Sequence, residues 1–211
     1  LRGTLNVKGL PNIDETFIDM ELEPLYVNTY RLENIIGAGA IPDNLLALGT
    51  INYTGRVTGF AYDLVTLGNL TSDQGNMYTD VHFQYDPDLG KSSFRGDLNT
   101  SAFNVGIIAG EPDLLGRISM HATIDGSIAR DNEMEMDMQS EISMMEFNDY
   151  TYSNMVVDGN LENDYFSGNF TIDDPNVKLT FNGIINMQDS IPLYDFKANI
   201  ARANLKQLNF Y

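Results

Sequence analysis

Apolar and polar residues alternate with a period of two through most of this sequence. In residues 118–128 the even positions are apolar or glycine and the odd positions are mostly Ser, His, Thr and Asp. The same alternation recurs in 1–7, 18–22, 51–57, 81–85, 94–98, 166–172, 177–187 and 194–200. This period is that of a β-strand with one apolar and one solvated face, as in antiparallel sheets. Short polar turns, such as those at 73–76, 86–90, 162–165 and 173–176, then predict an up-and-down meander.

A five-residue unit, apolar–x–Gly–x–apolar, recurs in these strands. It occurs at 1–5, 53–57, 94–98, 124–128, 157–161, 166–170 and 181–185. In each unit the glycine falls on the apolar face, and glycine inside a strand usually marks a bend or the close approach of another group. We therefore expect these glycines to let the sheet curl toward its apolar face and to leave room there for something other than protein. The predicted groove-curving glycines are Gly55, Gly96, Gly126, Gly159, Gly168 and Gly183.

The stretch RDNEMEMDMQSEISMMEF, residues 130–147, alternates acids and methionines. Residues i and i+2 of a strand lie about 7 Å apart, so Glu133, Glu135 and Asp137 cannot share one Ca²⁺ without help from a neighbouring strand. The turn at 173–176 offers oxygen ligands from Asp173, Asp174 and Asn176 that suit Ca²⁺. Neither place has EF-hand spacing, so a solvated face is the simpler interpretation of both.

The methionines of this stretch predict one wall of an apolar groove. Met134, Met136, Met138, Ile142 and Met144 share one parity, and the adjacent pair 144–145 indicates a bulge or the end of the wall. A single methionine is an ordinary core residue, but a whole set with interleaved Gly and Ala suits a surface that adapts to flexible apolar chains. The predicted lining is Ile118, Met120, Ile124, Ile128, Met134, Met136, Met138, Ile142, Phe166, Phe170, Leu179, Phe181 and Ile185.

Helices are expected to be few and short. Thr29 can cap a helix over 30–36, Asn44 one over 45–48, and Ser101 one over 102–110. The predicted fold is mainly β: a long antiparallel meander curled into a folded-over groove with an apolar interior, plus two or three short capping helices. We expect one elongated domain over 1–211, with initial strands and short helices in 1–45 and the glycine-punctuated meander in 46–211. Since the chain begins and ends inside apolar strand-like patterns, we interpret it as a fragment of a longer protein.

The composition excludes several functions. Asp and Glu number 30 against 12 Lys and Arg, a formal charge of −18, which argues against nucleic acid or an anionic membrane surface as partner. Without cysteine, and with His82 and His121 both at solvated strand positions, a zinc site is not expected. The GAGA run at 37–40 follows a helix instead of opening one, so it predicts no phosphate loop. We expect no catalytic residues, no metal and no cofactor, and no segment is apolar for long enough to span a bilayer as a helix.

Residues from about 40 to 211 resemble the AsmA-like/TamB family of bacterial envelope proteins. The resemblance rests on the strand-glycine pattern and on two phrases, FRGDLNTSAFNVG at 94–106 and DDPNVKLTFNG at 173–183. It implies an internal section of a periplasmic β-groove in a Gram-negative bacterium, anchored to the inner membrane outside this fragment. The family is associated with phospholipid movement and with outer-membrane protein assembly, and it offers no catalytic residues to carry over.

Three functions remain open at this point. The first is a groove that binds phospholipid acyl chains, with outer-membrane assembly proteins as further partners. The second is a structural module with a fully packed sandwich or barrel core, which binds protein partners through its sheet edges. The third is a carboxylate-based hydrolase, which would need two converging acids in a polar cleft, whereas the alternation places the acids on the outer face.

Overall fold

The computed structural model describes residues 2–37, 46–129, 133–188 and 190–210. Twelve strands form one antiparallel sheet whose spatial order is the order of the chain, from β1 to β12. The strands are β1 (Arg2–Lys8), β2 (Phe17–Asn28), β3 (Thr50–Phe60), β4 (Asp63–Ser72), β5 (Gly75–Asp86), β6 (Lys91–Asn104), β7 (Leu115–Ile128), β8 (Met134–Phe147), β9 (Tyr150–Glu162), β10 (Tyr165–Asp173), β11 (Val177–Asn186) and β12 (Leu193–Ala203). A 3₁₀ turn, η1 (Ile13–Glu15), precedes β2, and the helices are α1 (Thr29–Ile36) and α3 (Val105–Ala109).

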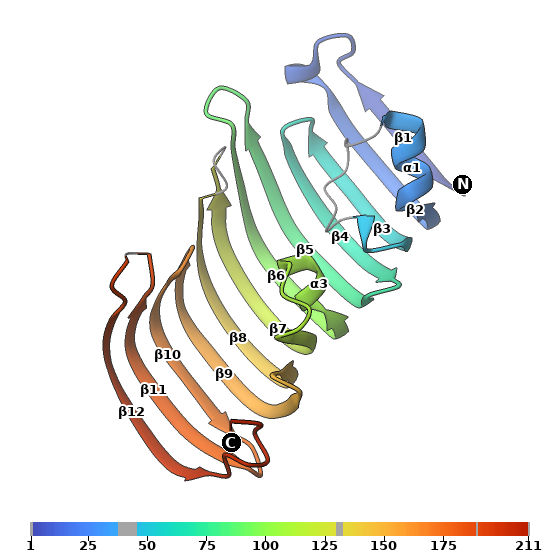
Figure 1. The fold of residues 1–211 in the computed structure, drawn as a ribbon. Helices are drawn as coiled ribbons and strands as arrows, with labels where there is room; N and C mark the ends of the chain where they lie inside the picture. The colour runs from blue at the N-terminus through green and yellow to red at the C-terminus, as the bar shows by residue number, and fades with distance from the viewer. Residues whose placement is uncertain (1, 38–45, 130–132, 189, 211) are drawn as a thin grey trace.

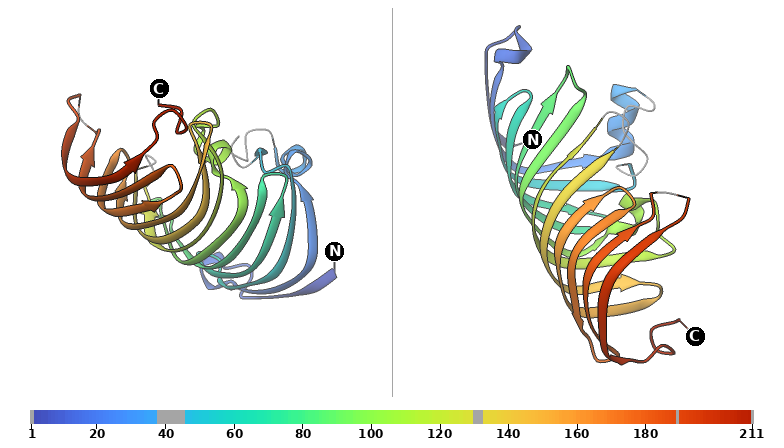
Figure 2. Two further views of the ribbon diagram at one scale, coloured as in Figure 1. Left: turned by 90° about the horizontal axis from the view of Figure 1, so that it is seen from below. Right: turned by 90° about the vertical axis from the view of Figure 1, so that its left-hand side faces the viewer.

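This architecture confirms the predicted fold class, a mainly β meander that curls. Each strand is hydrogen-bonded to the strand before it and the strand after it, as Figure 1 shows, and within the described residues β1 and β12 have one neighbour each. The sheet is therefore an open single layer. Seen from below, it is bent into a trough (Figure 2). The strand β4 was not among the segments that the alternation singled out, although the predicted turn at 73–76 directly follows it.

The two ends of the strands differ, and we name them as two rims. The helix rim carries α1, α3 and the segment Asn204–Phe210, because each of these follows an even-numbered strand. The hairpin rim, at the opposite strand ends, carries connections such as 61–62, 87–90 and 163–164. In Figure 1 all three elements lie at the same side of the sheet.

Register places the apolar sides of the strands in continuous rows across the sheet. One row crosses all twelve strands: Leu5, Met20, Val57, Thr66, Val81, Gly96, Ile124, Met138, Gly159, Gly168, Gly183 and Phe196. A parallel row runs from Gly3 to Ala198, another from Val7 to Tyr194, and a fourth from Leu25 to Ile200. None of the described members of these four rows carries a charge. We call this side the trough face and the opposite side the outer face.

The strand glycines permit close strand contacts, but part of the space beside them is filled by protein. Gly96 and Gly183 have φ values of 145° and 146°, where a Cβ would run into the neighbouring backbone carbonyl oxygen. At Gly159 a Cβ would meet the ring of Phe166 as well as a backbone carbonyl oxygen, and at Gly68 it would meet the phenol end of Tyr53 in the same way. Aromatic rings that cover strand glycines are a known way to support a curved sheet. The expectation that the glycines leave room for something other than protein is therefore wrong at Gly159.

The molecule exposes far more surface than a compact protein of its size. Its accessible surface is 13090 Å², whereas a compact monomer of this mass would expose about 9,800 Å². The excess follows from the single-layer architecture, since the described chain provides no second sheet to cover the trough face.

Two of the three predicted short helices are present in the described residues, but their caps or starting points differ from the predictions. The cap of α1 is Asn28, whose side chain accepts a hydrogen bond from the Arg31 backbone N–H at 3.1 Å. Thr29, the predicted cap, is instead buried, and its hydroxyl donates to the Leu46 carbonyl at 2.7 Å. The helix predicted after Ser101 starts later, because β6 continues to Asn104 through a bulge. The cap predicted at Asn44 lies outside the described residues.

The register flip predicted at 144–145 is present as a bulge in β8. Ile142 pairs with Met120, while Met145 pairs with Ile118, so the intervening residues absorb a shift. Met144 consequently faces outward opposite Ser119, which corrects its assignment to the apolar set. The apolar wall does not end at the bulge, since β8 continues to Phe147.

No helix in the described parts of the chain combines the length and apolar character needed to cross a membrane.

Candidate apolar binding face

All of the predicted lining residues share the trough face. Met138 and Ile124 lie opposite each other, Met136 lies opposite Leu161, and Phe170 lies opposite Phe181. The predicted curving glycines fall on the same face, within the same rows. The alternation was sufficient to assign a side to the strands that it singled out, because one register in a meander fixes the next.

The trough face is covered by protein only near the helix rim. There Ile118, Ile142 and Met155 form a buried cluster with neighbours from β9 to β11. Leu208 packs on this cluster from the segment Asn204–Phe210, and Val105 packs on it from α3. Figure 2 shows both covering elements on the hollow side of the trough.

Elsewhere much of the same face is half-buried or exposed, although Ile124 and Phe181 are buried, at 8% and 6% exposure. Met134, Met136 and Met138 are half-buried, and Ile128, near the hairpin rim, is 38% exposed. Phe196 on β12 is 48% exposed although its row contains no charged residue. These side chains meet water in the described molecule, and a contiguous apolar surface of this extent usually marks a binding site.

A cluster of phenylalanine rings crosses β10, β11 and β12 on the trough face. The rings of Phe170 and Phe181 are stacked with centroids 4.6 Å apart, and Phe196 lies 5.0 Å from Phe181. Phe166 completes the cluster at 6.0 Å from Phe181. The cluster gives this part of the face a rigid aromatic floor, since each ring is held by its neighbours.

An apolar pocket of about 350 Å³ lies between the sheet and the segment Asn204–Phe210. Its walls come from β8 to β12 and include Met155, Leu179 and Ile200. Sequence reasoning missed the residues that close it, Leu205, Leu208 and Phe210, because they follow the last strand and show no alternation. The spacing of Leu208 and Phe210, three and five residues after Leu205, was the one signal of a folded turn.

The turn at 173–176 is held by a buried carboxylate and is not an open calcium site. Asp174 is 2% exposed, and its Oδ1 accepts hydrogen bonds from the Tyr150 hydroxyl and from the Asn176 backbone N–H. Its Oδ2 accepts from the backbone N–H and the hydroxyl of Ser153, at 3.1 and 2.8 Å. Both oxygens are therefore occupied by protein donors, and Asp173 pairs with Lys178 at 2.7 Å.

These hydrogen bonds also set the acidity of Asp174. Burial by itself raises the pKa of this carboxyl, but the hydrogen bonds from Tyr150, Asn176 and Ser153 outweigh that effect. The pKa of Asp174 consequently lies below its ordinary value of 3.8. Burial raises the pKa of Tyr150, and its bond to the Asp174 carboxylate raises it further. The network ties the turn before β11 to the start of β9 and is structural.

The acids of the Met–acid stretch lie on the outer face, as the alternation implied. Glu133, Glu135 and Asp137 are exposed. Asp137 lies opposite Asp125 and accepts a hydrogen bond from the Asn160 amide at 3.1 Å. Among the described residues no group of three or more His, Cys, Asp or Glu side chains could hold a metal ion.

The two histidines differ in a way that their sequence context did not indicate. His121 is exposed, and its Nδ1 lies 2.9 Å from the Asn99 side-chain oxygen. His82 is half-buried and is hydrogen-bonded through Nε2 to Asp63 on the neighbouring strand β4. This contact and a second hydrogen bond from Gln84 lower the pKa of Asp63. The strand β4 was not singled out from the sequence, so its pairing with His82 could not be anticipated.

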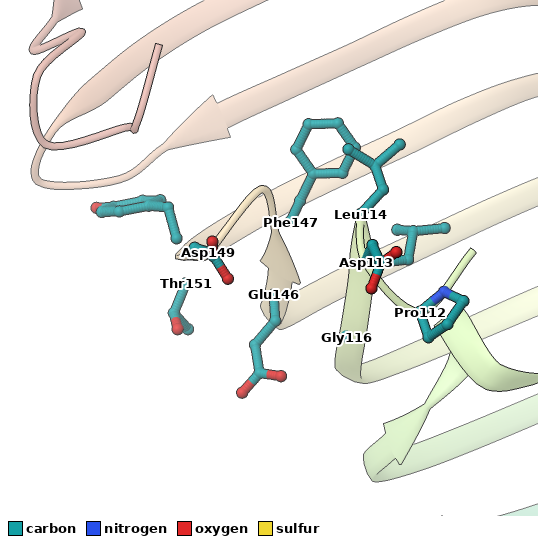
Figure 3. Close-up of a pocket in the computed structure, with 10 residues that line it drawn as sticks. Pro112, Asp113, Leu114, Gly116, Glu146, Phe147, Asp149 and Thr151 are labelled. Carbon is teal, nitrogen blue, oxygen red and sulfur yellow. The ribbon is translucent and has the colours of Figure 1, made fainter. Parts of the chain in front are cut away.

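A polar cleft of about 320 Å³ lies at the helix rim, between the loop at 112–116 and the β8–β9 turn (Figure 3). Three acids line it, Asp113, Glu146 and Asp149, from separate segments. The Glu146 carboxylate accepts a hydrogen bond from the Arg117 backbone N–H at 2.9 Å, and in Figure 3 the three carboxylates do not converge on one point.

Comparison with known proteins finds no matching family model, no matching curated protein and no matching solved structure.

Proposed function

We propose that this protein is a non-catalytic module whose trough face binds phospholipid acyl chains within a bacterial cell envelope. In this proposal it forms an internal section of a longer AsmA/TamB-like protein, anchored to the inner membrane outside this fragment. Its trough lets phospholipid move across the periplasm of a Gram-negative bacterium or supports outer-membrane assembly. The observation that carries the proposal is the uncharged trough face, which crosses twelve strands and is covered only near one rim.

An acyl chain suits this face for an energetic reason. The apolar side chains outside the covered region remain in contact with water, which is unfavourable in proportion to their area. Burying hydrocarbon yields about 0.8 kcal/mol per CH₂, so ten methylenes laid along the trough would contribute about 8 kcal/mol before ordering costs. The half-buried methionines 134, 136 and 138 can adjust their rotamers to chains of varied shape.

Lipid capture tests this proposal directly. The protein purified from bacterial membranes should release phospholipid on solvent extraction and show lipid-bound masses by native mass spectrometry. A photocrosslinking residue at Met136, Ile124 or Phe181 should capture lipid, whereas the same residue at the outer-face position Thr123 should not. Absence of lipid from both extraction and crosslinking would contradict the proposal.

Charging the trough provides the matched functional test. Met136→Asp combined with Ile124→Asp should abolish lipid binding, because a buried unpaired carboxylate cannot lie against hydrocarbon. The control pair is Thr123→Asp with Gln139→Asp, which places the same charges on the outer face of the same two strands. Circular dichroism should show that both double variants retain the sheet.

The exposed edge strand β12 favours a second candidate function, protein binding by strand addition. All eleven residues of β12 are exposed, and its outer edge has no strand partner among the described residues. Such an edge is a template for another chain, and an outer-membrane assembly protein could use it. Binding of this kind should survive Met136→Asp with Ile124→Asp. The N–H groups of neighbouring strand residues point to opposite edges, so one of Ala198 and Asn199 directs its N–H to the free edge of β12. Proline at that position should abolish the binding.

A further inference from the structure

The pocket beneath residues 204–210 differs from the rest of the trough face because protein encloses it on two sides. The sheet forms its floor through residues such as Met155, Leu179 and Ile200, and Leu208 lies above. Its volume, about 350 Å³, is within the range of about 300 to 1,000 Å³ typical of small-ligand pockets. Among the described residues that line it, none is charged, and Tyr152 alone carries a polar side-chain atom.

The segment Asn204–Phe210 is a folded cover. The Leu208 backbone N–H bonds to the Asn204 carbonyl at 3.1 Å, and the Phe210 N–H bonds to the Leu205 carbonyl at 3.0 Å. Two reciprocal bonds of 3.1 Å attach the cover to the β8–β9 turn: each of Asn148 and Asn209 donates its side-chain amide to the backbone carbonyl of the other. The cover therefore has a fixed position over the pocket, with Leu208 3% exposed beneath it.

The chemistry of the walls selects the class of occupant. A peptide that entered the pocket would bring backbone N–H and C=O groups that need partners, and the aliphatic and aromatic walls offer almost none. A lipid headgroup would be excluded for the same reason. A hydrocarbon chain brings no polar group and can enter end-on between floor and cover. Phe170 both lines the pocket and belongs to the phenylalanine cluster, so the pocket is continuous with the open trough face.

We infer that this pocket binds the methyl end of a single lipid acyl chain, with the remainder of the chain lying in the trough over the phenylalanine cluster. This inference rests on the proposed function and specifies where one chain is held. It assigns residues 204–210 as the cover of the site and Ala203, at the end of β12 opposite Val177, as a position whose side chain faces the occupant.

A graded series at Ala203 tests the inference. The probe is cis-parinaric acid, a fluorescent fatty acid, added to the full chain as purified and stripped of lipid. Ala203→Val, Ala203→Phe and Ala203→Trp fill progressively more of the pocket, and the affinity should fall in that order, by about tenfold or more for Trp. The matched control is Asn199→Trp, at an exposed position of the same strand but on the outer face and outside the pocket.

The chain contains no tryptophan, so each Trp variant also carries a unique donor for energy transfer to the probe. The smaller Val and Phe substitutions keep the test valid if Trp at 203 prevents folding, which circular dichroism and thermal unfolding would reveal. Loss of binding across the Ala203 series with retention in Asn199→Trp supports the inference.

Three results would overturn it, and they are distinguishable. If all the Ala203 variants bound the probe with the affinity of the wild type, the pocket would be excluded as the binding site, and the proposed function would still stand. Equal loss in Ala203→Trp and Asn199→Trp would show that tryptophan weakens binding by distorting β12 and not by filling the pocket. Failure of the wild type to bind the probe, together with no extractable lipid, would remove the proposed function and the inference with it.

Discussion

The trough face behaves differently at its two rims although its sequence pattern is the same throughout. Near the helix rim, Ile142 is 5% exposed, because α3 and the segment Asn204–Phe210 pack over its surroundings. Toward the hairpin rim, Met136 on the same strand is half-buried and has no such cover. Ile142 and Met136 are six residues apart in β8 and point to the same side of the sheet.

This difference shows that alternation specifies a face, whereas burial requires a second element above it. Rows without charged residues follow one another along the strands from one rim to the other, so the uncovered part is as free of charge as the covered part. Where the cover is present, the apolar side chains stabilise the fold by packing. Where it is absent, they are available to an apolar ligand. The same residue types therefore serve stability in one region and, in our proposal, binding in the other.

Alanine substitutions on one strand should separate the two regions most strongly. Ile142→Ala removes buried methyl groups from the covered cluster and should lower the free energy of unfolding by about 3 kcal/mol. For a chain of this length that corresponds to a fall in melting temperature of about 9 °C. Met136→Ala, at the open end, should cost about 1 kcal/mol or less. Thermal and denaturant unfolding followed by circular dichroism would measure both.

Equal destabilisation by the two substitutions would break the comparison. It would mean that the hairpin-rim half is packed as tightly as the helix-rim half. In that case a lipid trough would lose its structural basis, and the alternative of a packed interaction module would gain support.

The second-largest loss of stability should come from substitution of Asp174, because its carboxylate connects β9 to the turn before β11 at the covered end of the sheet. Asp174→Ala leaves the Tyr150 hydroxyl and both Ser153 donors without their acceptor, which should cost about 2 kcal/mol. Asp137→Ala on the outer face removes one exposed hydrogen bond and should change stability by about 0.5 kcal/mol or less. Urea unfolding of the two variants provides the test, and a smaller loss for Asp174 than for Asp137 would refute the structural role.

The pH dependence of the same carboxylate follows from its lowered pKa. Asp174 has a pKa below its usual value in the folded chain, so it binds its proton more readily in the unfolded chain. Its contribution is fully present above the unfolded-state pKa of about 3.9 and is lost as the pH falls through the lower folded value. The stability difference between the wild type and Asp174→Asn should accordingly be constant above about pH 5 and shrink below about pH 4. A difference that instead grew on acidification would show that the sign of the pKa shift is wrong.

The sequence predicted the sheet and its apolar side well, because both depend on local rules. Period-two alternation and polar turns were enough to give a meander, and register then carried the side of one strand to the next, as from Ile124 to Met138. The bulge in β8 was visible as two adjacent methionines. These features need only the chain's own geometry.

The cover and the polar contacts could not be predicted, since they depend on residues that meet only in the folded chain. Leu208 is buried by strands that precede it by dozens of residues, and its segment shows no alternation. Asp174 was interpreted as part of a solvated turn, because the sequence does not reveal that Tyr150 and Ser153 lie within reach. The filling of the space beside Gly159 by Phe166 is likewise a cross-strand contact.

The smallest effect should come from releasing the cover without changing the cluster beneath it. Asn209→Ala removes one of the two reciprocal amide bonds to Asn148 and should cost about 1 kcal/mol, most of it locally. Hydrogen exchange at the Leu208 and Phe210 amides should become about fivefold faster, because the segment opens more often while the sheet stays folded. Asn160→Ala, which removes an exposed outer-face bond to Asp137, is the control and should leave these two amides unchanged. If exchange at Leu208 accelerated only together with exchange in β9 and β11, the cover would be part of the cooperative core, and the two regions of the trough face would be less separate than their exposure indicates.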